Sequence, residues 1–126
     1  MGTMNNKHID QLISRYPQLF LCKDDILQAY AIMKEAYAGD HKLLIAGNGG
    51  SAADSEHIAG ELMKRFAIAR PVSKDIAEKL IQIDPLRGPE LARNLERGLM
   101  AIPLVAHEAL STAYINDVDG LGVFAQ

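Results

Sequence analysis

Three residues with acid–base or metal-binding side chains follow a glycine-rich segment at helical spacing. Asp54, His57 and Glu61 occupy positions i, i+3 and i+7, which places them on one face of a helix. An imidazole and a carboxylate four residues apart can hold one metal ion, or act as base and polarising group on one substrate. The same spacing is typical of a solvated helix face, and spacing alone leaves both interpretations open.

The segment before this helix has the composition of a tight turn between a strand and a helix. It consists of Gly47, Asn48, Gly49, Gly50 and Ser51. The three glycines allow positive φ angles and a close approach of the backbone to a ligand. The free N–H groups and positive dipole end of a following helix suit a phosphate or another anion. Ser51 would either cap that helix or donate its hydroxyl to a phosphate oxygen.

These residues together resemble the signature of the sugar isomerase (SIS) domain family, and within it the phosphoheptose isomerase group. The shared pattern is GNGGS-x-x-D-x-x-H-x-x-x-E over residues 47–61, and a weaker likeness runs from about Ile9 to the end. The resemblance implies an α/β fold with a parallel sheet and helices on both faces, a flavodoxin-like three-layer arrangement. It also implies a homo-oligomer, a dimer or tetramer, with active sites at subunit contacts.

The resemblance further implies an activity and a role for each motif residue. Relatives of this kind convert sedoheptulose 7-phosphate to a heptose 7-phosphate used in bacterial glycans such as lipopolysaccharide. Glu61 would be the catalytic base, with His57 beside it, and a zinc site would include both residues. The substrate and its phosphate would be bound by the remaining motif residues: Gly47, Asn48, Gly49, Gly50, Ser51 and Asp54.

The chain departs from the family pattern after its second expected strand. The family's Thr/Asp-Thr-Ser segment falls near Val105–Ala109, which keeps almost none of it. A further Gln and His for metal and acid roles, and a second Ser-rich phosphate loop, belong downstream of the positions seen here. We therefore expect residues 1–126 to be the N-terminal portion of one SIS-type domain, with a helical insertion over residues 67–100.

Composition narrows the class of protein. The chain has 126 residues, which suits one domain, and 48% of them are hydrophobic. Its net charge of −3 without a basic cluster argues against nucleic acid as a partner. No apolar run approaches the length of a membrane span, and the N-terminus is unlike a signal peptide. The lone Cys22 is consistent with a reducing cytoplasm.

Hydrophobic periodicity and turn residues predict alternating helices and strands. The expected strands are 42–46 and 100–105, the second with Pro103 at an edge of the sheet. The expected helices before and after the first strand are 5–16, 24–38 and 52–66; the second is capped by Asp24 or Asp25 and followed by Gly39, and the third has an apolar stripe of Ile58, Leu62 and Phe66. Two further helices are expected to begin at Ser73 and Pro89, and the second of these to end at Gly98. The two strands should be parallel, joined by a crossover. Two strands are few for such a sheet, so we expect the core to be completed by a larger domain or a partner chain.

The residues after the second strand share an edge of the sheet with the glycine loop. In an open parallel sheet, ligands bind at the carboxyl ends of the strands. His107 or Glu108 could therefore reach the same ligand as the loop, although a lone histidine after a strand is more often a surface residue or one with its polar atoms already bonded. Ser111 and Thr112 lie just beyond them.

Three functions are compatible with these patterns. The first is a phosphosugar aldose–ketose isomerase that forms an enediol with Glu61 as base. The second is a non-catalytic phosphosugar-binding or regulatory module, in which the loop works without the acid–base pair. The third is dinucleotide binding, because Gly47-x-Gly49-x-x-Ala52 fits a loose fingerprint. That fingerprint also needs an acidic residue at the tip of the next strand. Residues 67–70, where it should occur, contain no acidic residue and are not predicted to form a strand.

Overall fold

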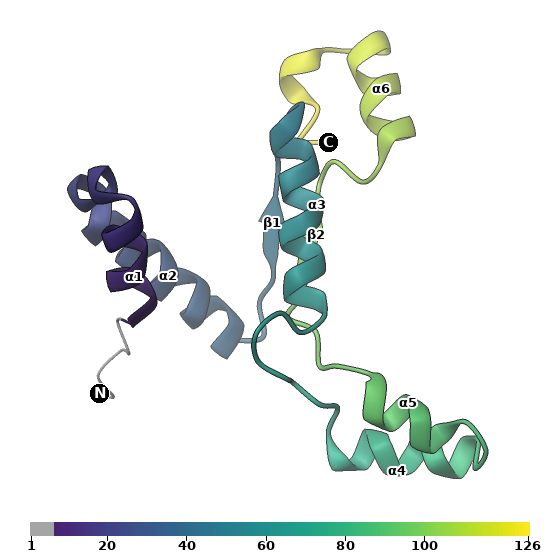
Figure 1. The fold of residues 1–126 in the computed structure, drawn as a ribbon. Helices are drawn as coiled ribbons and strands as arrows, with labels where there is room; N and C mark the ends of the chain where they lie inside the picture. Colours follow the sequence, from purple (N-terminus) through teal and green to yellow (C-terminus); the bar gives the residue numbers. More distant parts are fainter. Residues whose placement is uncertain (1–6) are drawn as a thin grey trace. The chain divides into compact units, whose positions relative to one another are not determined.

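The structure is a computed structural model that describes residues 7–126, and it divides into two compact units. One unit ends at His41 and the other spans Lys42–Gln126. Figure 1 labels the helices and strands of both units. Among residues 7–126, no helix has both the length and the apolar character needed to cross a membrane.

The first unit is helical. It contains α1 (Lys7–Arg15), the 3-10 helix η1 (Pro17–Cys22) and α2 (Lys23–Ala38). α1 ends just before Pro17, as predicted, whereas the expected start at residues 5 and 6 lies outside the described residues. η1 lies between the first two predicted helices, where no element was predicted. A proline at its first position fits this, because the fixed φ angle of proline favours the first turn of a helix.

α2 ends at Ala38, as predicted, whereas its expected N-terminal cap differs from the structure. Cys22, not an aspartate, precedes the helix, and Asp24 and Asp25 lie within its first turn. Carboxylates in that turn still stabilise the positive end of the helix dipole. At the other end Gly39 has a φ of −92°, and the left-handed residue is Asp40, with a φ of 55°. Aspartate adopts this conformation more readily than most residues because its short side chain bonds locally.

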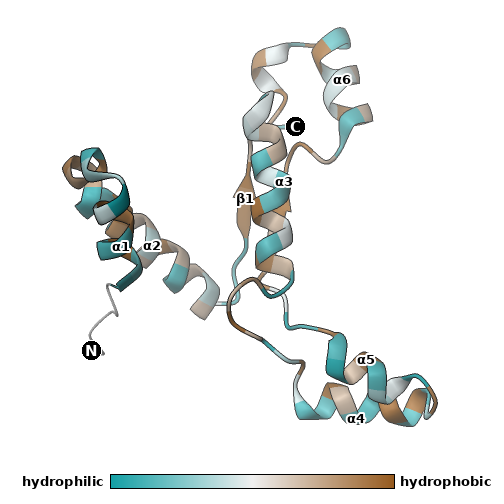
Figure 2. Cartoon of the chain, viewed as in Figure 1, coloured by the Kyte–Doolittle hydropathy of each residue, from teal (hydrophilic) through white to brown (hydrophobic). Residues whose placement is uncertain are grey.

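The second unit contains the predicted parallel strand pair. β1 (Leu43–Ile45) and β2 (Ala101–Pro103) pair in the register Leu43↔Ala101 and Ile45↔Pro103. The backbone N–H of Leu104 donates to the carbonyl of Ile45 over 2.8 Å, which extends the ladder past Pro103. Both strands are shorter than predicted, and Figure 2 shows the apolar character of β1. The α/β fold with a parallel sheet is therefore confirmed.

α3 (Gly50–Met63) packs on this sheet through small residues. The buried residues are Ser55 and Ala59 on α3 and Ala101 on β2. The Ser55 hydroxyl donates to the Ser51 carbonyl over 2.7 Å, so its burial leaves no unpaired donor. Small side chains on both elements let the helix approach the strands closely.

The predicted apolar stripe of α3 is wrong in two of its three members. Ile58 is 45% exposed, and Phe66 is 81% exposed and lies beyond the end of the helix. The helix ends at Met63 because Lys64 adopts an extended conformation. The prediction from residue spacing therefore made the helix about one turn too long. It also placed large apolar residues on the packed face, which in the structure carries the small residues Ser55 and Ala59.

The two faces of the sheet differ in their exposure. Side chains alternate along each strand, so Leu44 and its register partner Ile102 share a face. Leu44 is 56% exposed and Ile102 is 40% exposed, whereas Ala101, on the other face, is buried. The sheet, for which the family resemblance implies helices on both faces, thus retains substantial exposed apolar surface on one of them.

Residues 67–100 contain the predicted helical pair, as α4 (Lys74–Ile83) and α5 (Gly88–Asn94). Ser73 caps α4 by accepting a hydrogen bond from the backbone N–H of Ile76 at 3.4 Å, as expected. Pro89 lies in the first turn of α5, also as expected, but this helix ends well before Gly98. A Cβ atom at Gly88 would overlap the backbone of α4, so glycine is needed where the two helices meet. The role of this segment as an insertion stays a prediction.

Arg70 and Glu96 hold together the two ends of the segment that carries this helical pair. The Arg70 guanidinium donates to the carbonyls of Leu62 and Lys64 at the end of α3, at 2.7 and 2.8 Å, and to Arg97 at 3.0 Å. The Glu96 side chain is 10% exposed; it accepts from the Arg70 backbone N–H and pairs with Arg65 over 3.3 Å. These bonds satisfy C-terminal carbonyls that α3 itself leaves unpaired.

We predict that Arg70→Ala destabilises the chain by about 1.5–3 kcal/mol, because hydrogen bonds from a charged donor to three carbonyls are lost. The urea midpoint, followed by circular dichroism, measures the effect. Lys74→Ala is the control, since its pair with Glu78 is a distant 3.8 Å and the lysine is 89% exposed. Equal midpoints for the two variants would contradict the assigned role of Arg70.

Candidate functional site

The turn between β1 and α3 is built around a hydrogen-bonded ring. The Ser51 hydroxyl accepts from the backbone N–H of Asn48 and donates to the carbonyl of the same residue, both over 2.8 Å. Ser51 lies inside the first turn of α3, and the N-cap position is occupied by Gly49. The predicted capping role of Ser51 is therefore wrong, and its hydroxyl stabilises the loop itself.

The three loop glycines have different structural roles. Gly49 alone has a positive φ, at 57° with a ψ of −122°, a conformation that side chains other than hydrogen rarely allow. At Gly47 a Cβ atom would overlap the backbone of Ser51, so the loop packs closely on itself there. A Cβ atom at Gly50 would meet nothing within 4 Å. The expectation that all three provide positive φ is thus correct for one of them.

The start of α3 offers backbone donors to an anion. Among the described residues, no acceptor is found for the backbone N–H groups of Gly49 and Gly50. These groups lie where the helix dipole is positive, and both features favour a phosphate or carboxylate. The geometry predicted for an anion-binding loop is therefore present, while the binding itself stays a prediction.

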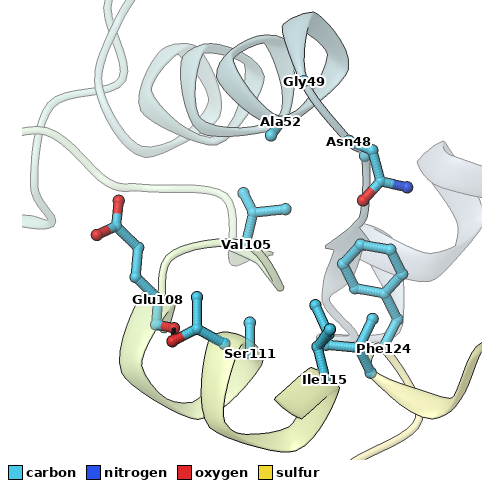
Figure 3. Close-up of a pocket in the computed structure, with 11 residues that line it drawn as sticks. Asn48, Gly49, Ala52, Val105, Glu108, Ser111, Ile115 and Phe124 are labelled. Carbon is cyan, nitrogen blue, oxygen red and sulfur yellow. Dashed lines mark hydrogen bonds between the residues drawn. The ribbon is translucent and has the colours of Figure 1, made fainter. Parts of the chain in front are cut away.

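A cavity of about 360 Å³ lies between this loop and the residues after β2, as Figure 3 shows. The later residues belong to α6 (Glu108–Asp117), to the 3-10 helix η2 (Gly120–Gly122) and to the segment that follows it. The cavity is lined by Gly47, Asn48, Gly49, Ala52, Val105, Glu108, Ser111, Thr112, Ile115, Val123 and Phe124. The shared edge expected from the sequence is thus present, with Glu108 at the cavity, whereas His107 precedes α6 and is not among the lining residues.

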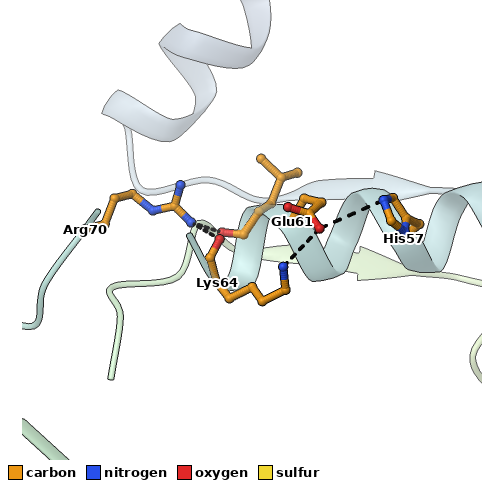
Figure 4. Close-up of polar contacts among 5 residues, drawn as sticks. His57, Glu61, Lys64 and Arg70 are labelled. Atoms are coloured by element: carbon orange, nitrogen blue, oxygen red, sulfur yellow. Dashed lines mark hydrogen bonds and ion pairs between the residues drawn. The ribbon is translucent and has the colours of Figure 1, made fainter. Parts of the chain in front are cut away.

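Glu61 is the centre of a small polar cluster on α3, which Figure 4 shows. Its Oε1 lies 3.0 Å from Lys64 Nζ and 3.9 Å from His57 Nε2. Its other oxygen, Oε2, is buried and has no hydrogen-bond partner among the described residues. The Lys64 contact was missed from the sequence, although the i, i+3 spacing to Glu61 would have indicated it.

The glycine loop and Glu61 lie far apart along α3. Glu61 follows Gly50 by eleven residues, which corresponds to roughly 16 Å along a helix axis. None of Asp54, His57 and Glu61 lines the cavity. The structure therefore brings the loop together with α6, and it leaves the imidazole and carboxylate further along the helix.

The donors available for a zinc ion are incomplete in this part of the chain. A zinc site needs three or four protein ligands, and His57 and Glu61 provide two. No group of three or more His, Cys, Asp or Glu residues suited to a metal occurs within residues 7–126. A zinc ion at this position would need further ligands from outside the described residues.

Comparison with known families identifies the domain. The family model described as SIS domain matches residues 8–98, which is more than half of the chain. The chain belongs to the SIS domain family. The match includes the whole GNGGS loop and α3, so the family assignment and the anion-loop geometry concern the same residues.

Relatives of this SIS domain include several phosphoheptose isomerases. The protein from Halorhodospira halophila is 42% identical over 62 residues, which are 49% of this chain and 31% of the relative. Phosphoheptose isomerase 2 of Campylobacter jejuni is 56% identical over 43 residues, or 34% of this chain and 21% of the relative. The matched stretch thus spans about a third or less of the length of these relatives. No solved structure matches the chain.

We predict that Gly49→Ala destabilises the loop by about 1–3 kcal/mol, because alanine is strained at this positive φ. Gly50→Ala is the matched control, with no steric conflict and a better helix propensity. Urea unfolding measures the stability of both variants, and amide chemical shifts of Asn48 and Ser51 report on the loop. A neutral Gly49→Ala variant with unchanged shifts would show that the described turn is incorrect.

Proposed function

We propose that this SIS domain is part of a phosphosugar aldose–ketose isomerase acting on sedoheptulose 7-phosphate, with Glu61 as its base. Several relatives of this chain are phosphoheptose isomerases, which supports the substrate class. The phosphate would bind the amides at the start of α3. His57 would polarise the substrate carbonyl, and zinc would be an additional cofactor if further ligands complete its site.

The observation that carries this proposal is the state of the Glu61 carboxylate. One oxygen is held by Lys64 at 3.0 Å, while the other is buried and has no hydrogen-bond partner within residues 7–126. A buried, unpaired acceptor is costly in a folded protein, so its presence requires an explanation. We infer that this oxygen accepts the substrate proton after the carboxylate turns out of its buried position.

The proposed reaction moves one proton between two neighbouring carbons. Glu61 removes the proton from C1 of the ketose while the C2 carbonyl oxygen gains a proton, which gives an enediol. Glu61 then returns its proton to C2, and loss of the O1 proton creates the C1 aldehyde. A positioned general base contributes about 10²–10⁴-fold to such a step.

The distance along α3 leads us to propose that the site is shared between two copies of the chain. The loop and Glu61 stand roughly 16 Å apart on one helix, and His57 is 77% exposed. In a homo-oligomer, Glu61 of one copy would face the substrate held by the loop of another. This arrangement agrees with the subunit-contact sites that the family resemblance implies.

We expect Glu61→Gln to reduce isomerisation of sedoheptulose 7-phosphate by about 10²–10⁴-fold while leaving its binding within a few fold. The assay uses this chain and a longer form that extends past Gln126, together with metal analysis. Glu56→Gln is the control, because it makes the same change on an exposed position of α3. Full activity of Glu61→Gln would reject Glu61 as the base.

A mixing experiment tests the shared site. Gly49→Ala and Glu61→Gln variants of the longer form are each expected to be nearly inactive alone. Mixed oligomers would contain some sites with an intact loop and an intact Glu61, so mixing should restore activity. No recovery, with exchange of subunits verified by mass spectrometry, would place both groups in one copy's site.

A non-catalytic phosphosugar-binding module is the second candidate. It is favoured by one observation, namely that the cavity beside the loop is lined by none of the three acid–base residues of α3. Binding of sedoheptulose 7-phosphate without turnover, in a form that extends past Gln126, would support this function over the isomerase.

A further inference from the structure

Among the described residues that line the cavity beside the glycine loop, one has a charged side chain, and its charge is negative. This residue is Glu108, the first residue of α6, and no Lys, Arg or His is found beside it in that lining. Within residues 7–126, no ion pair or hydrogen bond is found for its carboxylate. The carboxylate is therefore available to a ligand.

Glu108 and the glycine loop lie at different ends of the cavity. Figure 3 shows Glu108 at one end and Asn48 at the other, with Val105 and Ala52 between them. The loop end has the unpaired N–H groups of Gly49 and the residue after it, together with the positive end of the α3 dipole. The cavity is thus electrically polarised along its length.

This polarity matches a molecule that is anionic at one end and rich in hydroxyl groups at the other. Ionised carboxylates accept hydrogen bonds and donate none, so Glu108 suits sugar hydroxyls. The reverse orientation would place a phosphate beside Glu108 without a neighbouring cation, which like-charge repulsion disfavours. The Thr112 hydroxyl already donates to the Glu108 carbonyl over 2.7 Å, whereas no bond is found for the hydroxyl of Ser111 in the described structure.

We propose that Glu108 is a specificity-determining residue that binds sugar hydroxyls and directs the phosphate of the ligand toward Gly49. The inference rests on the proposed phosphosugar function, and it adds a residue from α6 to the loop and α3. A purely structural alternative is that Glu108 stabilises the N-terminus of its own helix through the dipole.

Isothermal titration calorimetry with two probes tests this role. The probes are sedoheptulose 7-phosphate and inorganic phosphate, and the quantity compared is the ratio of their dissociation constants. Glu108→Ala should reduce the preference for the sugar phosphate by at least about tenfold, because hydrogen bonds to a charged acceptor are lost. Binding of inorganic phosphate should stay unchanged or become tighter. Glu108→Gln should fall between, since its amide oxygen still accepts.

The controls separate the possible failures. Glu90→Gln makes the same charge change in the first turn of α5, away from the cavity, and should leave the ratio unchanged. An unchanged ratio in Glu108→Ala, with a lower urea midpoint, would assign Glu108 to helix stability alone and overturn the inference. A wild-type chain that binds neither probe would overturn the proposed function, and this inference with it.

Discussion

The bonds between Ser51 and the backbone of Asn48 fix the turn on which the remaining site geometry depends. They hold the chain while it reverses from β1 into α3, and the positive φ of Gly49 makes that reversal sterically possible. The direction of α3 then determines where its first amides point. It also determines which of its faces packs on β2. The conformation of this one turn therefore controls both the anion-binding amides and the packing of α3 on the sheet.

α3 packs on the sheet through small side chains. Ser55, Ala59 and Ala101 bring helix and strand together with little apolar area. Burial of small side chains contributes less hydrophobic stabilisation than burial of leucine or isoleucine. Leu44 and Ile102 retain apolar surface on the other face. Hydrogen bonds such as those of Arg70 add to the order of this unit.

The sequence correctly predicted those helix ends that are determined by residues within one turn. Pro17, Ser73 and Pro89 act through backbone chemistry within one turn, and each has the predicted effect. Helix length and packed face depend on tertiary contacts, which explains why the stripe through Ile58 and Phe66 failed.

One part of the candidate site could be predicted from the sequence, and another part could not. The glycine loop and its neighbour Glu108 follow from the topology of parallel strands. The separation of Glu61 from the cavity required the actual face and length of α3, because motif spacing along a sequence does not give distances to a ligand.

The contacts between Pro71 and Glu96 have a consequence for how this domain varies. They form an antiparallel bridge at the base of the α4–α5 pair, so the segment that follows α3 and the segment that leads into β2 lie side by side. The entropy of closing a loop rises only slowly with its length once its ends are fixed. Segments of very different size can therefore be exchanged above this bridge while the register of β1 and β2 is preserved. Such an exchange would let related proteins acquire new surfaces without rebuilding the nucleus of the fold.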